Sequence, residues 1–256
     1  MSLKSTDVFL CDSALVMATI EEKLEAWNQS LVASIPLGGL FTRNPVAYKW
    51  KAPFRSFMLR ETACWRIHDL LTQSYRLHQH GYGLGARILL RSAFETLATL
   101  IHLNQLVQDV INGTMDFHLF CEKTSTLLLG SRNASDGPRA INILTVLQKC
   151  EQIYPGIIEI YADLSESAHP NYEGLCTGYT TINHDEYETI FSDRWMELHG
   201  DQHVIWLELC KSIFYHEYNE VWGEAVEPFE KWIEANDEML EATKGKQKET
   251  LRELST

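Results

Sequence analysis

Arg87, Arg91 and Glu95 follow one another at four-residue steps in an otherwise apolar stretch of the chain. Helical spacing places all three in one polar stripe on one face of a helix. Because a charge inside a helical bundle is costly unless it is paired, the stripe indicates either a binding role or a structural one. The binding interpretation is a guanidinium positioned for a phosphate or carboxylate, with Glu95 orienting Arg91. The structural interpretation is an Arg91–Glu95 ion pair that also fastens a neighbouring helix.

Tyr161, Ser165 and His169 form a second series with the same spacing, and Pro170 follows directly. The spacing predicts one helix face, and the proline predicts that the helix ends at His169. An imidazole at that position is a candidate general acid or base. A Ser165–His169 nucleophile pair is the weaker alternative, because no glycine-flanked turn surrounds the serine. A histidine that caps helix carbonyls is the structural alternative.

Metal and cofactor chemistry finds little support in the sequence. His199 and His203 are four residues apart and would share a divalent ion on a helix, but Gly200 weakens that helix and no third ligand is fixed by spacing. The six cysteines include no C-x-x-C pair. We therefore expect no metal site, no cofactor, and reduced thiols typical of a cytoplasmic protein.

Two short motifs carry a resemblance to a known family. They are Leu89-Leu90-Arg91-Ser92-Ala93-Phe94-Glu95 and, some 70 residues on, Tyr161-x-x-Leu164-Ser165-x-x-x-His169-Pro170. Together they resemble a bacterial family of uncharacterised proteins that looks related to the all-helical HEPN group. The likeness covers roughly residues 55–220.

The resemblance implies a function as well as a fold. HEPN proteins often form homodimers, and many are metal-independent ribonucleases of toxin or phage-defence systems. Their catalytic Arg and His lie four to six residues apart on one helix, whereas here Ser165 stands in the arginine position. Arg91 would then supply the guanidinium from another helix, with His169, Glu95 and Ser165 as catalytic partners and Arg87 and Tyr161 binding phosphate or another ligand. RNA or a nucleotide is the implied partner; the alternative is a non-enzymatic helical interaction module with a buried Arg/Glu/His network.

The charge distribution bears on these two functions in opposite ways. The chain has 35 acidic and 22 basic side chains, a net charge of −13, which argues against non-specific binding to nucleic acid. Residues 43–91 nevertheless hold nine basic side chains against two acidic ones. They predict an anion-facing patch if they converge. The alternative is that they pair with the acidic segment 185–256.

Apolar residues recur with helical periodicity along most of the chain. Helices are expected at about 7–35, 53–80, 84–111, 115–130, 139–153, 155–169 and 193–242, the last broken near Gly200 and Pro228. Residues 36–52 are expected to be a loop, and one short strand or hairpin is expected near 175–190. The apolar segment 88–107 contains Arg91, Glu95 and His102, which favours a core helix over a membrane span. We therefore predict one all-α domain, 1–256, an irregular up-and-down bundle of six to eight helices with a frayed end from about 243.

Overall fold

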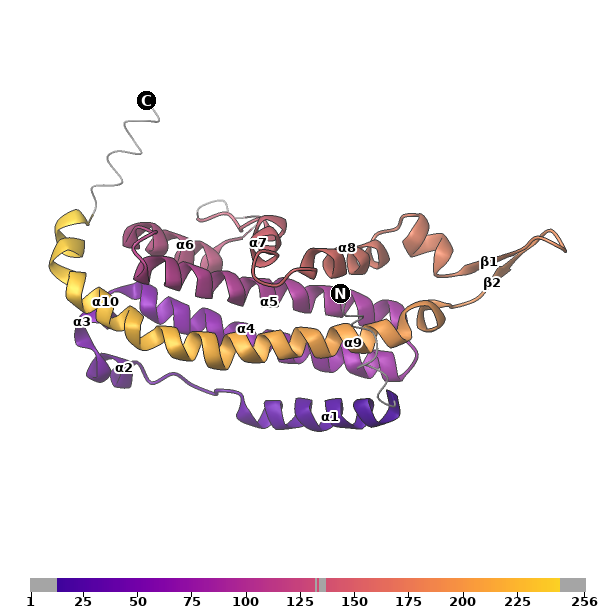
Figure 1. Ribbon diagram of the computed structural model, residues 1–256, viewed down its shortest axis with the longest axis horizontal. Helices are drawn as coiled ribbons and strands as arrows, with labels where there is room; N and C mark the ends of the chain where they lie inside the picture. Colours follow the sequence, from indigo (N-terminus) through magenta and orange to yellow (C-terminus); the bar gives the residue numbers. More distant parts are fainter. Residues whose placement is uncertain (1–12, 132, 134–136, 245–256) are drawn as a thin grey trace, which may run out of the picture. The chain divides into compact units, whose positions relative to one another are not determined.

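The computed structural model describes residues 13–131, 133 and 137–244, of which most are helical. These residues form ten α-helices, two short π-helical segments and one two-stranded antiparallel hairpin (Figure 1). The all-α fold with a single hairpin agrees with the sequence prediction. In the described part of the chain, no helix combines the length and the apolar character needed to cross a membrane.

The described residues divide into two compact units. The first comprises residues 13–31, 64–97 and 153–213, and the second comprises the remainder. Elements of the first unit are α1 (Ser13–Ser30), the end of α4 (Lys51–Gln79), the start of α5 (Gly83–Ile111), α8 (Ile157–Ala168), the π-helical segment η1 (Tyr172–Thr177), β1 (Thr180–Asn183), β2 (Glu188–Phe191) and most of α9 (Trp195–His216). The second unit adds α2 (Leu37–Arg43), α3 (Pro45–Lys49), α6 (Phe117–Leu129), α7 (Ile143–Cys150), the π-helical segment η2 (Glu217–Val221) and α10 (Trp222–Thr243).

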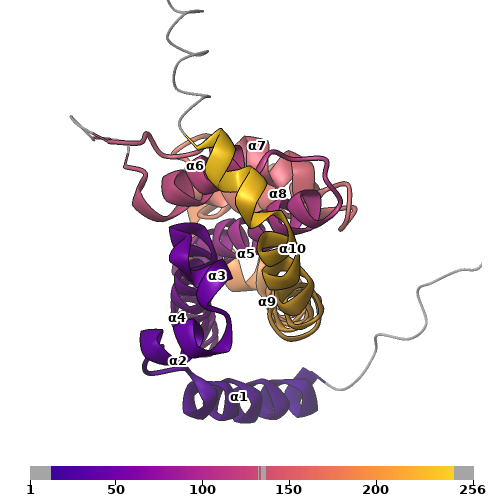
Figure 2. The ribbon, with the colours of Figure 1, turned by 90° about the vertical axis from the view of Figure 1, so that its left-hand side faces the viewer.

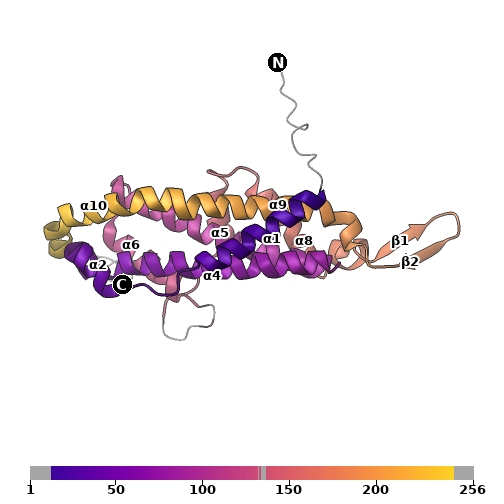
Figure 3. The same ribbon diagram turned by 90° about the horizontal axis from the view of Figure 1, so that it is seen from below.

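Helix α5 is buried along most of its length in both units, as its nearly continuous apolar sequence predicts. In the first unit α1 lies across the end of α4 (Figure 3), where Trp27 Nε1 donates to Cys64 Sγ at 3.3 Å. The His68 ring on α4 also lies 3.1 Å from the carbonyl oxygen of Leu24. In the second unit α3 packs beside α10 (Figure 2).

Helix ends follow local signals that the sequence contains. Asp116 caps α6 by accepting from the backbone N–H of Leu119 at 2.9 Å, and Asn142 caps α7 in the same way. Helix α8 ends at Ala168 because Pro170 holds His169 in an extended conformation, with φ −96° and ψ 141°. This end agrees with the prediction to within one residue.

Three expectations for the helices were wrong. Residues 36–52 are not a loop but contain the short helices α2 and α3, which raises the helix count above the expected six to eight. Gly200 does not break α9, because its carbonyl oxygen is held by His78 Nε2 at 2.9 Å. Pro228 lies inside α10 and does not break it. The proline leaves the carbonyl oxygen of Glu224 without an N–H donor, but both residues are exposed, so water can take the place of that donor. Apart from Thr243 and Lys244, the expected frayed end lies outside the described residues. Residues 7–12 of the first expected helix lie outside them too.

The hairpin is anchored at its base by Trp195, whose side chain is buried in the first unit. Gly178 lies against this ring so closely that a Cβ atom there would be 2.4 Å from it. The strands pair in register Thr180↔Phe191 to Asn183↔Glu188. Tyr187, in the turn, has φ +56°, a left-handed conformation that is costly for a residue with a bulky side chain. A fixed base therefore supports a turn held in a strained conformation.

Candidate functional site

Arg91 is the centre of a polar cluster that joins α5 to α8. Its Nε donates to Ser165 Oγ at 2.9 Å, and its Nη2 donates to the Tyr161 hydroxyl at 2.6 Å. Glu95 Oε1 lies 3.1 Å from Arg91 Nη2 and accepts a hydrogen bond from the hydroxyl of Tyr161 at 2.8 Å. The structure thus brings together four of the residues that the sequence singled out. We call them the Arg91 network: Arg91, Glu95, Tyr161 and Ser165.

The Arg91 network lies at the border between core and solvent. The side chains of Arg91 and Glu95 are 25% and 26% exposed, whereas Tyr161 is buried. Burial, reinforced by the hydrogen bond to Glu95, raises the pKa of Tyr161, so its hydroxyl stays protonated and acts as a donor. Because Arg91 Nε and Nη2 are both engaged by protein groups, an anion that bound these atoms would have to displace an internal partner.

Arg87 lies one turn earlier on α5 and is almost fully buried, with 1% of its side chain exposed. Its Nε donates to Ser167 Oγ at 2.6 Å, and its Nη2 forms an ion pair with the carboxylate of Asp163. Burial lowers the pKa of Arg87, and Asp163 opposes that shift. In this position Arg87 is a second connection between α5 and α8 and is closed to an incoming phosphate.

Asp163 and Ser167 were not predicted as site residues. A signal for them exists in the sequence, since they are spaced four apart on α8, as Tyr161 and Ser165 are. The two pairs lie on opposite flanks of α8, and each pair meets one of the two arginines of α5, which are also four apart. Matching i,i+4 polar pairs on two helices would have indicated an interhelical network.

His169 stands apart from the Arg91 network. It follows α8 as the C-cap residue, its side chain is exposed, and no described residue forms a polar contact with its ring. The extended conformation that Pro170 imposes redirects the chain after His169. Among the described residues, neither the expected partnership of this imidazole with the Arg91 network nor its expected cap on helix carbonyls is formed.

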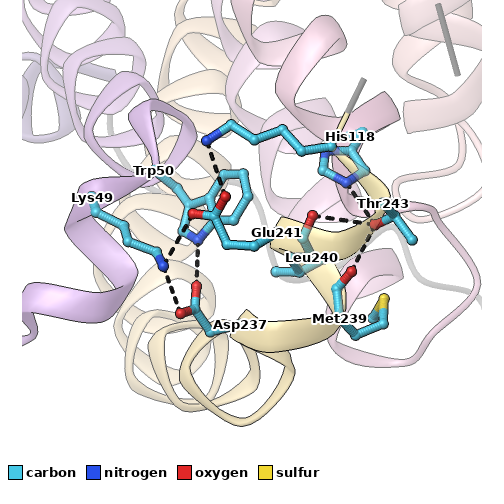
Figure 4. Close-up of polar contacts among 9 residues, drawn as sticks. Lys49, Trp50, His118, Asp237, Met239, Leu240, Glu241 and Thr243 are labelled. Carbon is cyan, nitrogen blue, oxygen red and sulfur yellow. Dashed lines mark hydrogen bonds and ion pairs between the residues drawn. The ribbon is translucent and has the colours of Figure 1, made fainter. Parts of the chain in front are cut away.

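Several basic residues of segment 43–91 are neutralised by carboxylates. Arg43 Nε lies 3.0 Å from Glu230 Oε2, and Lys49 Nζ lies 2.6 Å from Asp237 Oδ2 (Figure 4). Both acids belong to α10, within the acidic segment 185–256. Arg60 similarly pairs with its neighbour Glu61 and stacks on Tyr218, as Arg87 and Arg91 pair with Asp163 and Glu95. The pairing alternative is therefore right for Arg43 and Lys49, whereas Arg60, Arg87 and Arg91 pair with acids outside segment 185–256.

His199 and His203, which were considered as metal ligands because of their spacing, do not pair. His203 instead stacks on His78, with ring centroids 5.1 Å apart, while His199 stacks on Trp195. Burial is the main reason that the pKa of His203 falls to about 3, and Ser74 Oγ lies 3.1 Å from its Nε2. No group of three or more potential metal ligands occurs in the part of the chain that the structure describes.

A buried polar contact that the sequence did not reveal occupies the second unit. Asn104 on α5 donates from Nδ2 to Glu217 Oε2 at 2.6 Å and to the Glu217 carbonyl oxygen at 3.0 Å. Glu217 begins the π-helical segment η2, where backbone hydrogen bonds join residues five apart instead of four. A lone Asn in an apolar helix signals a buried partner but does not identify it.

Comparisons with protein-family models, with curated proteins and with solved structures found no match to this chain.

Proposed function

We propose that this chain is a non-enzymatic helical interaction protein in which the Arg91 network holds α8 against α5. The observation that carries the proposal is the closure of the network, in which Arg91 Nε and Nη2 both donate to groups of the same molecule. A guanidinium that must bind phosphate needs donors directed toward the ligand site. Here those donors connect two helices instead.

The charge pairing supports the same proposal. Affinity for a nucleic-acid backbone comes largely from Lys and Arg side chains that neutralise phosphates. Arg43 and Lys49 are already paired with carboxylates of α10, and Arg87 is buried against Asp163. These three side chains already have partners within the molecule and are less available to an external polyanion, whereas Lys51, Arg66 and Arg76 are exposed.

The test is an RNA-cleavage assay combined with thermal unfolding. In the presence of a chelator the purified protein should leave single-stranded, structured and transfer RNA intact. Arg91→Ala should lower the melting temperature because it leaves Glu95 and the two hydroxyls without their donor. His169→Ala should unfold as the parent protein does, and so should the matched control His184→Ala, which removes another exposed histidine. Metal-independent cleavage that is lost in His169→Ala alone would overturn the proposal.

One observation favours a second function, an RNA-directed nuclease or nucleotide-binding protein of the HEPN type. About a quarter of the Arg91 and Glu95 side chains is open to solvent, and His169 is exposed at the end of the same helix that holds Ser165. In that function His169 is the general acid or base. His169→Ala then lowers the cleavage rate by about 10²–10⁴-fold, and added salt weakens RNA binding.

A cytoplasmic location and a homodimeric state belong to the proposal as well. The five cysteines among the described residues, 64, 121, 150, 176 and 210, are all free thiols. Unpaired thiols are typical of proteins from a reducing compartment. Sedimentation equilibrium of the purified protein measures the oligomeric state directly.

A further inference from the structure

Residues 172–191 expose an unusual number of large apolar side chains. Phe191 is 78% exposed and Ile182 is 58% exposed, although both lie in strands. The same stretch contains four more exposed members: Tyr172, Leu175, Tyr187 and Ile190. Contiguous exposed apolar residues on a soluble domain mark interaction sites. The hairpin and the adjoining segment η1 are therefore the part of the first unit most suited to contact a partner.

The strand register places Ile182 and Phe191 on one face of the hairpin and Ile190 on the other. Thr180 is opposite Phe191, and Ile182 is opposite Thr189. Cross-strand partners point to the same side of a sheet, and residues two apart on a strand do so too. Phe191 and Ile182 therefore share a face with two threonines, and this face carries no charged residue. We call it the uncharged face: Thr180, Ile182, Thr189 and Phe191.

The outer edge of β2 is open. The backbone N–H of Ser192 donates to the carbonyl oxygen of Tyr179 at 3.0 Å, which fixes the alternation of hydrogen bonds along the pair. Glu188 and Ile190 then bond toward β1, while Thr189 and Phe191 direct their N–H and C=O groups outward. No residue in the described ranges pairs with these outward groups.

The two edges of the hairpin differ. The outer edge of β1 is partly covered, because Arg194 Nη1 donates to the carbonyl oxygen of Thr180 at 2.9 Å. β2 contains neither lysine nor proline, the residues that most often protect an exposed strand edge. The β2 edge is thus the one available for pairing with another strand.

The charge around the hairpin indicates the chemistry of that strand. Between Pro170 and Arg194 the chain has five carboxylates and no lysine or arginine. Three of the five lie in the turn or at the start of β2: Asp185, Glu186 and Glu188. A basic partner complements this charge, whereas a second acidic copy of this chain would be repelled.

We propose that the outer edge of β2 binds an extended, basic segment of a partner protein, which adds to the hairpin as a third strand. Alternate apolar side chains of the segment pack on the uncharged face, and its lysine or arginine side chains lie beside the carboxylates. The base of the hairpin is fixed by Trp195 against Gly178, so the edge is preformed and less ordering accompanies binding. This inference rests on the proposed function, because it supplies the partner of the interaction protein.

The experiment measures binding of a fluorescent synthetic peptide of alternating lysine and isoleucine to the full chain by anisotropy. A second peptide has the same sequence but carries N-methyl groups on alternate residues, so that one edge cannot form backbone hydrogen bonds. A third replaces lysine with glutamate. The parent protein should bind the first peptide and should not bind the glutamate peptide. Its affinity for the N-methylated peptide should be at least tenfold lower than for the first.

Variants of the protein locate the site. Thr189→Pro removes one outward N–H and is compatible with the β1–β2 pairing, because that N–H does not bond to β1. It should weaken binding at least tenfold, whereas Thr189→Ala, which keeps the N–H, should change it less than twofold. Phe191→Ser should also weaken binding, and the matched control Leu129→Ser, which alters a residue 59% exposed on α6, should not. Unchanged near-UV circular dichroism and melting temperature verify that each variant keeps the parental packing.

Three results would overturn the proposal. Equal affinity for the N-methylated peptide would mean that charge alone attracts the probe. Unchanged binding by Thr189→Pro would place the site elsewhere. A concentration-dependent dimer of the parent that Thr189→Pro dissociates would show that the edge pairs with a second copy. Each of these results leaves the RNA-cleavage test of the proposed function unaffected, so the two can fail separately.

Discussion

Acidification should destabilise this protein well before its carboxylates become protonated. His203 and His102 are both buried, and burial is the main cause that lowers their pKa values, to about 3 and about 4. In the unfolded chain both histidines return to the ordinary value of about 6.5. The folded state therefore binds fewer protons than the unfolded state at any pH between these limits. Their contribution to stability is complete above about pH 6.5 and is lost as the pH falls toward 3–4.

The size of the effect follows from the two shifts. At pH 5 an unfolded histidine is almost fully protonated, whereas both buried histidines are still neutral. Each buried histidine therefore lowers the free energy of unfolding by ~2 kcal/mol at pH 5 relative to neutral pH, and the two together lower it by ~4 kcal/mol. This is a large part of the 5–15 kcal/mol that is typical of a folded domain. Most carboxylates remain ionised above pH 5, so the interval from 6.5 to 5 isolates the histidines.

Urea unfolding at pH 7.0, 6.0 and 5.0, followed by circular dichroism, measures this loss. His203→Phe keeps a ring beside His78 and removes the titrating group. It should therefore remove about half of the pH dependence of the unfolding free energy, whatever its effect on stability at pH 7. His184→Ala, which alters an exposed histidine, should retain the parental dependence. A parent protein whose unfolding free energy is constant from pH 7 to 5 would contradict this prediction, because one or both histidines would then be accessible to protons in the folded state.

Two further predictions concern packing and the Arg91 network. Replacing Arg91 by Met or Glu95 by Leu should each cost ~1–3 kcal/mol in urea unfolding, and the double replacement should cost clearly less than the sum; additive losses would contradict the coupling. Gly178→Ala should cost ~1–3 kcal/mol, because the added methyl group would overlap the Trp195 ring. Gly223→Ala, in an open part of α10, should instead raise the melting temperature slightly, and equal effects of the two would show that the Trp195 contact is unimportant.

The sequence predicts the long helices well because their signals are local and repeated. Apolar periodicity gives α4 and α5 to within about two residues of their observed ends, and Pro170 fixes the end of α8. It fails for α2 and α3, which are too short to show a period. It also fails at Gly200 and Pro228, because the contact that holds Gly200 in α9 comes from a distant helix and Pro228 lies on an exposed face.

The candidate site is predictable only in part. The Arg91–Glu95 pair follows from i,i+4 spacing within one helix, and Tyr161 and Ser165 follow from the same rule on another. Which arginine meets which pair depends on how α5 and α8 are aligned, and the spacing within each helix does not contain that information. Arg87 was therefore expected to face a ligand, although it is buried against Asp163.

The π-helical segment η2 has a consequence for how this chain tolerates changes in length. Glu217 and Trp222 are both buried although they are five residues apart, whereas the next buried positions of α10, Ala225 and Phe229, follow at three and four. A π-turn is equivalent to an α-helix with one residue inserted. Deleting exposed Asn219 would restore α-helical spacing and keep both flanking faces directed to the core. A single-residue insertion in the middle of α10 would instead turn every later side chain by about 100°.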